Sequence, residues 1–96
     1  MDKKIEEVRN MIDKVDRQLV PLLVERINLA MEVIKYKSTE EEVHGKDRVQ
    51  IVLDKVEKLA QNSGGHEKTV AKIYESIIKE LTNLQLEIFY KNHPDL

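Results

Sequence analysis

The sequence predicts an all-α protein of three helices. Apolar residues recur at steps of three and four along three long segments, which is the period of an amphipathic helix. Two short stretches without this period, residues 39–45 and 61–65, separate the segments. Charged residues make up 35% of the 96 residues and aromatic residues only 4%, a composition typical of helices packed around a thin aliphatic core.

Length and composition restrict the classes of function. A chain of 96 residues is enough for one domain, so we expect a single domain over residues 1–96. With no cysteine, the chain has no disulfide, thiolate nucleophile or Cys-ligated metal. The net charge of −2, with both signs interspersed, argues against a nucleic-acid binder. There is neither a membrane-spanning run nor a signal-peptide core, so we expect a cytoplasmic protein.

The first helix is predicted from about residue 4 to about residue 38. Apolar positions from Ile5 to Ile34 keep one helical phase, and Pro21 lies in the middle of them. An interior proline costs a helix about 3 kcal/mol. Because the phase does not change at Pro21, we expect one long kinked helix, with two helices meeting at Pro21 as the lesser alternative.

A helix of this length would span roughly 50 Å, more than the width of a small globule. A partner chain is therefore needed to cover it, and a thin core in a small chain also favours oligomerisation.

The second and third helices are shorter. The second is predicted to start at Asp47 or a neighbour, and the third to run from about His66 to about Lys91. The breaker Gln61-Asn62-Ser63-Gly64-Gly65 separates them. Residues 39–45, TEEEVHG, lack a period and end in glycine, so we expect a loop there.

Polar side chains interrupt the apolar faces of all three helices. They are four cations and one amide: Arg9, Arg26, Lys37, Arg48 and Gln85. An unpartnered buried cation costs of the order of several kcal/mol. Either these side chains lie at helix edges with their charged ends in water, or they converge on an anion. In the second case the ligand is a small dianion or dicarboxylate, which guanidinium groups bind in bidentate fashion.

The chain offers no evident acid–base or covalent chemistry. Its histidines, His44, His66 and His93, lie in predicted loop or tail positions without metal-ligand spacing, so we expect them to be solvated surface residues. Asp13 and Asp16 are interpreted as a solvated acidic face. Neither a metal nor another cofactor is expected. A cationic pocket of this kind suits a reaction that needs only conformational restraint and stabilisation of developing charge.

The residues that carry these features resemble the all-helical class of chorismate mutases over nearly the whole chain. That family has an early Arg, then the pattern I-D-x-x-D-x-x-L-x-x-L-L-x-x-R-x-x-L-A, a Lys, an Arg opening the second helix and a Gln deep in the third. The matching positions here are Arg9, Ile12, Asp13, Asp16, Leu19, Leu22, Leu23, Arg26, Leu29, Ala30, Lys37, Arg48 and Gln85.

The resemblance implies an intertwined homodimer of three-helix chains that converts chorismate to prephenate by a pericyclic rearrangement in aromatic amino-acid biosynthesis. It implies that Arg9 reaches into the partner's site, while Arg26 and Arg48 bind carboxylates in their own. It further implies that Lys37 and Gln85 donate to the ether oxygen of the enolpyruvyl group. Lys37 and Gln85 are thus the candidate catalytic residues.

Departures from the family pattern keep other functions open. The family usually has Glu after the second-helix Arg, a hydroxyl residue four before the Gln, and Asp three before the Arg. Here these positions are Val49, Leu81 and Gly45. The Arg-Val dipeptide and a shorter loop resemble isochorismate-pyruvate lyases, which form salicylate and pyruvate. A 4-amino-4-deoxychorismate mutase and a non-catalytic helical dimerisation module are further alternatives.

Overall fold

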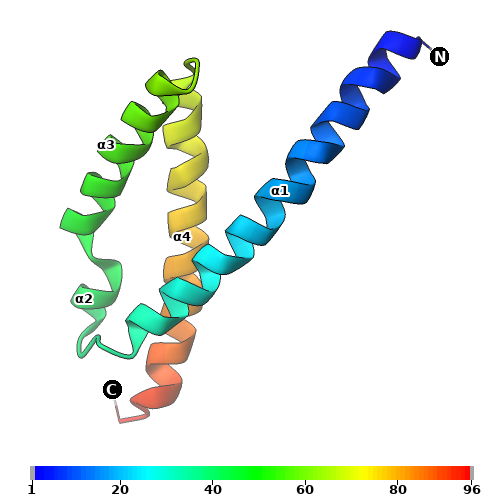
Figure 1. Ribbon diagram of the computed structural model, residues 1–96. Helices are drawn as coiled ribbons and strands as arrows, with labels where there is room; N and C mark the ends of the chain where they lie inside the picture. The colour runs from blue at the N-terminus through cyan, green and yellow to red at the C-terminus, as the bar shows by residue number, and fades with distance from the viewer. Residues whose placement is uncertain (1, 96) are drawn as a thin grey trace. The chain divides into compact units, whose positions relative to one another are not determined.

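The computed structural model describes residues 2–95 and contains four helices in that range (Figure 1). They are α1 (Lys3–Ile34), α2 (Glu40–His44), α3 (Lys46–Asn62) and α4 (Glu67–Asn92). Residues 2–95 include no strand, which confirms the predicted all-α class with three long helices. None of the described helices combines the length and apolar character needed to cross a membrane. The chain divides into two compact units, Met1–Glu32 and Val33–Leu96, which are described in turn.

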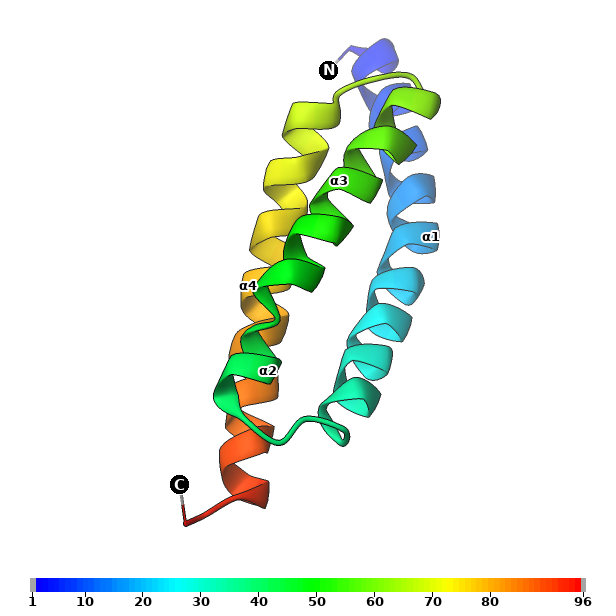
Figure 2. The same ribbon diagram turned by 90° about the vertical axis from the view of Figure 1, so that its left-hand side faces the viewer.

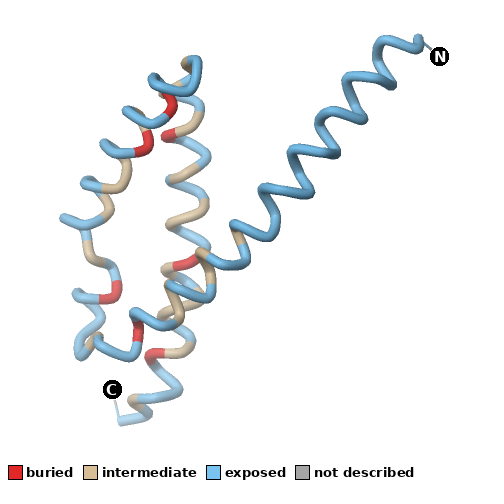
Figure 3. Tube along the Cα trace, in the orientation of Figure 1, coloured by how far each residue is buried: buried red, intermediate tan, exposed pale blue. Residues whose placement is uncertain are grey.

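The first unit consists of most of α1. At the start of the helix, Asp2 Oδ1 accepts a hydrogen bond from the backbone N–H of Lys4 at 2.9 Å, as an N-cap does. The helix continues through Pro21 without a break, so the alternative of two helices meeting at this proline is wrong. None of the described residues of this unit is buried, and large apolar side chains are exposed along its length (Figure 3). They are Ile5, Val8, Met11, Ile12, Val15, Leu19, Val20, Leu22, Val24 and Leu29.

α1 ends four residues earlier than predicted, and Lys37 therefore lies beyond the helix. The backbone N–H groups of Tyr36 and Lys37 donate to the carbonyls three residues before them, Val33 and Ile34, at 3.0 and 3.1 Å. This tighter bonding is typical of a last helical turn that does not continue. The expectation that Lys37 lies on the apolar face of the first helix is thus wrong.

Residues 39–45 form a capped helix rather than the predicted loop. Thr39 has extended backbone angles, and its Oγ1 accepts from the N–H of Glu42 at 3.1 Å. The acidic side chains of the first turn interact favourably with the positive end of the helix dipole and so stabilise α2. Gly45 ends α2 in the left-handed conformation, with φ 51° and ψ 51°, and donates its N–H to the Glu41 carbonyl. Both ends of α2 are thus capped by hydrogen bonds within residues 39–45, which explains a helix in a stretch without apolar periodicity.

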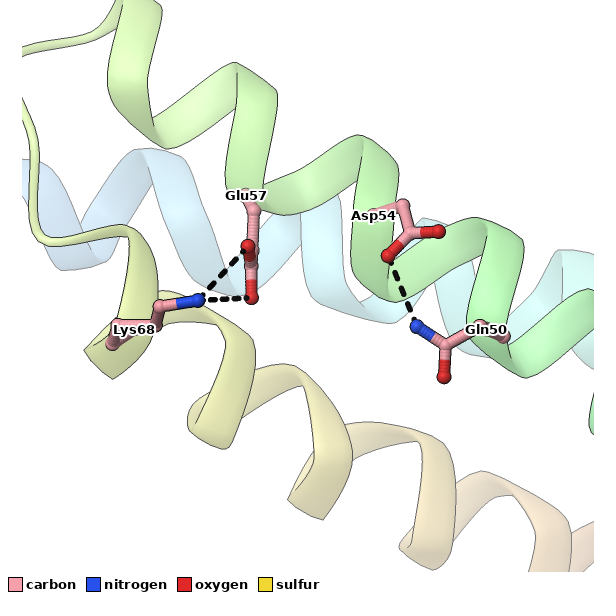
Figure 4. Close-up of polar contacts among 4 residues, drawn as sticks. All are labelled: Gln50, Asp54, Glu57 and Lys68. Atoms are coloured by element: carbon pink, nitrogen blue, oxygen red, sulfur yellow. Dashed lines mark hydrogen bonds and ion pairs between the residues drawn. The ribbon is translucent and has the colours of Figure 1, made fainter.

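α3 and α4 pack against each other, and the turn between them is where the sequence predicts a break (Figure 2). Gly64 and Gly65 have φ values of 114° and 115°, which favour glycine. Near this turn Lys68 Nζ of α4 lies 3.4 Å from the Glu57 carboxylate of α3 (Figure 4). On α3 itself, Gln50 Nε2 donates to Asp54 Oδ1 at 3.0 Å.

The buried side chains all belong to the second unit. They are Ile34, Val43, Val56, Ala60, Ala71, Leu81 and Phe89. Phe89, 1% exposed, is the most completely buried, and it forms a cluster with Ile34 and Val43. This cluster joins the last residue of α1, the short helix α2 and the end of α4. It therefore fixes the segment on either side of α2.

Candidate functional site

Two of the five predicted site residues, Lys37 and Arg48, line one open surface hollow in the second unit. The hollow is formed entirely by the segment that contains α2 and the residues flanking it. Its lining is Lys37, Thr39, Glu40, Glu41, Glu42, His44, Gly45, Lys46, Asp47 and Arg48. The structure thus brings together two cations that are eleven positions apart in the sequence.

Local backbone geometry sets the positions of both cations. Lys37 follows the tight turn that ends α1 and is half-buried. Arg48 lies in the first turn of α3 and is exposed. Between them, Gly45 is both the C-cap of α2 and the N-cap of α3, and its left-handed conformation is one that other residues rarely adopt. A side chain at this position would be strained, so the glycine sets the angle between the two helices.

Neither cation is neutralised within the described chain. Over residues 2–95, the Lys37 ammonium and the Arg48 guanidinium form no ion pair or hydrogen bond. Two of the neighbouring acids are already engaged, since the Tyr90 hydroxyl donates to Glu40 and the Thr39 hydroxyl donates to Glu42 Oε1 at 3.4 Å. The two cations are therefore available to an external anion.

The hollow as a whole is not cationic. Its lining includes the cations Lys37, Lys46 and Arg48, but one more acidic side chain than cations. The acids are Glu40, Glu41, Glu42 and Asp47. A dianion bound here would need positive charge beyond what these residues supply.

The remaining three predicted site residues do not line this hollow. Gln85 is half-buried on α4 and engaged in polar contact. Arg9 and Arg26 belong to the first unit. Arg9 is exposed and its Nη1 lies 3.1 Å from Glu6 Oε1, one turn earlier on α1, whereas Arg26 is half-buried. An exposed pair of this kind contributes about 0.2–1 kcal/mol, so a stronger anionic partner can replace it.

Comparison with known proteins identifies the family. A model of the family "Chorismate mutase type II" matches residues 8–86. The chain belongs to this family. It is also similar to a protein named chorismate mutase from Methanocaldococcus jannaschii, with 28% identity over 86 residues that cover 88% of this chain and 87% of the relative.

All five predicted site residues fall within the chorismate mutase match. Arg9 lies just inside its first residue and Gln85 just inside its last. The match ends before Phe89, Tyr90 and His93, so the contacts that these residues make lie outside the matched span.

One histidine differs from the sequence prediction. His93 is half-buried rather than solvated, because its ring stacks on Phe89 with centroids 4.3 Å apart and planes 25° apart. Its Nδ1 also lies 2.9 Å from the Phe89 carbonyl oxygen. His44 and His66 are exposed, as expected.

Sequence reasoning missed α2 and the α4 residues that hold it. A signal was present, because Thr39 followed by three glutamates and a terminal Gly45 has the usual start and stop residues of a helix. The contact of α2 with Phe89 and Tyr90, about fifty residues later in the chain, has no comparable local signal.

Proposed function

We propose that this protein is a chorismate mutase, an isomerase that rearranges chorismate to prephenate. The observation that carries the proposal is the family match over residues 8–86, which includes all five candidate site residues. The name of the Methanocaldococcus jannaschii relative supports the same activity. No cofactor takes part in the proposed reaction.

The proposed mechanism uses cations and hydrogen-bond donors rather than acid–base catalysis. Breaking the C–O bond of chorismate builds negative charge on the ether oxygen, and Lys37 and Gln85 donate to it. Arg26 and Arg48 hold the two carboxylates, which keeps the side chain of the substrate over the ring. The free ammonium of Lys37 and the free guanidinium of Arg48 support these roles. Donors aimed at developing charge stabilise a transition state more than a ground state.

The proposed site needs more positive charge than the hollow provides. Lys37 and Arg48 share the hollow with more acids than cations, and chorismate carries two carboxylates. We infer that Arg26 and the Arg9 of a second copy supply the additional positive charge. Such a shared site would follow the family pattern, with these two arginines of α1 adding to Lys37 and to Lys46 and Arg48 of α3.

We infer that the second copy pairs through α1. The apolar face of α1 is exposed in the single chain, with Leu19 near its middle 55% exposed. Covering such a face stabilises the covered state by about 25 cal/mol for each Å² of apolar surface removed from water. A homodimer would provide that cover and would also place the Arg9 of each copy beside the other copy's site.

Product analysis tests the proposed function. The purified protein is offered chorismate and isochorismate in separate reactions, and the products are separated chromatographically. We expect prephenate from chorismate. Salicylate and pyruvate from isochorismate, with no prephenate from chorismate, would instead establish the lyase.

Binding of a bicyclic oxa-bridged dicarboxylate, a mimic of the transition state, separates an enzyme from a plain dimerisation module. We expect tight binding, because the mimic carries both carboxylates and the ether oxygen in the geometry of the transition state. A protein that neither turns over chorismate nor binds this mimic is not a chorismate mutase.

A further inference from the structure

The short helix α2 is held to the end of α4 by an apolar and a polar contact. Val43, 6% exposed, packs with Phe89 and Ile34 in the buried cluster. On the same helix, Glu40 accepts a hydrogen bond from the Tyr90 hydroxyl. A five-residue helix is far too short to be stable alone, so these contacts determine where α2 lies.

The two ends of α2 lead directly to the two cations of the hollow. Lys37 is two residues before the N-cap Thr39, and Arg48 is three residues after the C-cap Gly45. The caps leave little freedom at either joint. A movement of α2 on α4 would therefore carry Lys37 and Arg48 with it and change where both cations lie relative to Gln85 of α4.

We propose that Tyr90 is a positioning residue for the substrate site, acting through its hydroxyl on Glu40 and hence through α2 on Lys37 and Arg48. The proposal rests on the function proposed above. Tyr90 lies outside the residues that the family model matches and is not among those lining the hollow. The contact is thus a feature of this chain that the family assignment does not supply.

The hydroxyl has a second effect, on the electrostatics of the hollow. Glu40 is one of its acids and lies in the same segment as the two cations. A carboxylate engaged by a phenol is held away from an ammonium that it would otherwise pair with. Tyr90 thereby keeps Glu40 from neutralising Lys37, which must remain available to the ether oxygen.

The substitution Tyr90→Phe isolates the hydroxyl. The ring of Tyr90 meets Phe89 edge-on, with centroids 5.8 Å apart and planes 73° apart, and phenylalanine retains that contact. The substitution adds no charge and leaves Val43 and Phe89 in place. We expect kcat/KM for chorismate to fall about three- to tenfold, the range for losing one such hydrogen bond. Affinity for the bicyclic dicarboxylate mimic should fall by the same factor.

A matched control removes a polar contact elsewhere in the same unit. Lys68→Gln breaks the contact between α4 and Glu57 of α3 near the 61–65 turn, remote in sequence from both α2 and Tyr90 (Figure 4). It should leave kcat/KM within about twofold of the unsubstituted protein. Thermal midpoints of both variants are measured beside their rates, so that a general loss of stability is recognised.

Two further variants test whether Tyr90 acts through the proposed residues. Glu40→Gln keeps an oxygen that accepts from Tyr90, and kcat/KM should fall less than it does in Tyr90→Phe. In a Lys37→Ala background, Tyr90→Phe should lower kcat/KM by a smaller factor than in the unsubstituted protein, since one of the two residues that it positions is gone.

The outcomes separate this inference from the proposed function. If the unsubstituted protein is active and Tyr90→Phe changes kcat/KM no more than Lys68→Gln does, the role of Tyr90 is overturned and the proposed function stands. A full three- to tenfold loss in the Lys37→Ala background also overturns it, because Tyr90 would then act independently of Lys37. If the unsubstituted protein forms no prephenate from chorismate, the proposed function fails and the inference falls with it.

Discussion

The two units of this chain are both built from amphipathic helices, yet only one of them buries its apolar face. Val33–Leu96 contains every buried side chain of the described residues, and Phe89 is almost completely enclosed. Met1–Glu32 has an apolar stripe as regular as that of α4, but leaves it exposed. All four aromatic residues of the sequence also lie in the second unit. Periodicity therefore predicts which face of a helix is apolar, but not what covers it.

The difference has an energetic consequence. A single helix gains most of its stability from packing its apolar face, and α1 also contains Pro21 in its interior, at a cost of about 3 kcal/mol. The second unit has internal packing to offset such costs. We therefore expect α1 to depend on a second copy and Val33–Leu96 to depend on its own core.

The largest expected effect comes from placing a carboxylate on the exposed stripe of α1. If Leu19 stays solvent-exposed, Leu19→Asp changes stability by no more than about 0.5 kcal/mol. If a partner covers it, the buried carboxylate costs of the order of several kcal/mol. We expect the latter, seen as a shift from dimer to monomer in sedimentation at micromolar concentration. Chorismate mutase activity should be lost with the dimer.

Asn10→Asp is the matched control for Leu19→Asp. It adds the same side chain to the same helix, nine residues away, which at 3.6 residues per turn is the opposite side of α1. It should remain a dimer with unchanged activity. A monomeric unsubstituted protein, or a Leu19→Asp variant that sediments as a dimer, would contradict pairing through this face.

The second unit is tested by removing its central side chain. Phe89→Ala should lower the free energy of unfolding by about 3–5 kcal/mol, the usual cost of truncating a buried aromatic residue. The measurement is urea denaturation followed by circular dichroism. Phe89→Leu, which keeps a large apolar side chain, should lose clearly less. A loss below about 1 kcal/mol for Phe89→Ala would mean that the core does not depend on this residue.

Lys37 tests whether the hollow of the second unit carries the chemistry. Lys37→Ala should lower kcat about 10²–10³-fold, because a donor to the ether oxygen acts where charge develops. KM should change less than kcat, and the urea midpoint should hardly move. Gln85→Ala should show a smaller loss, since a neutral donor is weaker than a charged one. Lys35→Ala, an exposed lysine two residues away, is the control. Normal turnover in Lys37→Ala would exclude this role.

The sequence predicts much of the second unit because its boundaries carry strong local signals. The turn at Gly64-Gly65 needs positive φ values that glycine adopts readily. The end of α3 and the start of α4 lie on either side of this turn and could be predicted from it. The end of α1 was predicted too late, and the helix α2 was missed although Thr39 and Gly45 signal its two ends locally. The packing of Ile34 and Val43 against Phe89 has no local signal, because it joins positions far apart in the chain.

The sequence predicts five candidate site residues but not their geometry. Two of them, Lys37 and Arg48, share one hollow in the structure, although Lys37 lies beyond the helix on whose face it was predicted. Their spacing depends on the caps of α2, and their place relative to α4 depends on the contact of Glu40 with Tyr90. Neither feature has a periodic signature. The proposed roles of Arg9 and Arg26 depend on what covers α1, and a single sequence specifies that cover only through the length of its apolar stripe.

The smallest expected effect is an alkaline titration that reports on the second unit alone. All three tyrosines lie in Val33–Leu96, and the sequence has no tryptophan to obscure the ultraviolet absorbance of tyrosinate. The hydrogen bond to Glu40 raises the pKa of Tyr90 above its ordinary value of 10.0, with smaller contributions from burial and from the charge of Glu40. We expect Tyr90→Phe to remove a late-ionising tyrosine from the titration. Glu40→Gln should lower the pKa of Tyr90 towards its ordinary value.

The direction of this pKa shift determines how the stability of the protein depends on pH. Because folding raises the pKa of Tyr90, its hydrogen bond to Glu40 contributes fully to stability at pH values below the unfolded pKa of about 10. That contribution is lost as the pH rises through the higher folded pKa, because tyrosinate cannot donate to Glu40 and repels it. Chorismate mutase activity should therefore fall at high pH in a step that Tyr90→Phe lacks. The same pH step in Tyr90→Phe would assign the alkaline loss to another group.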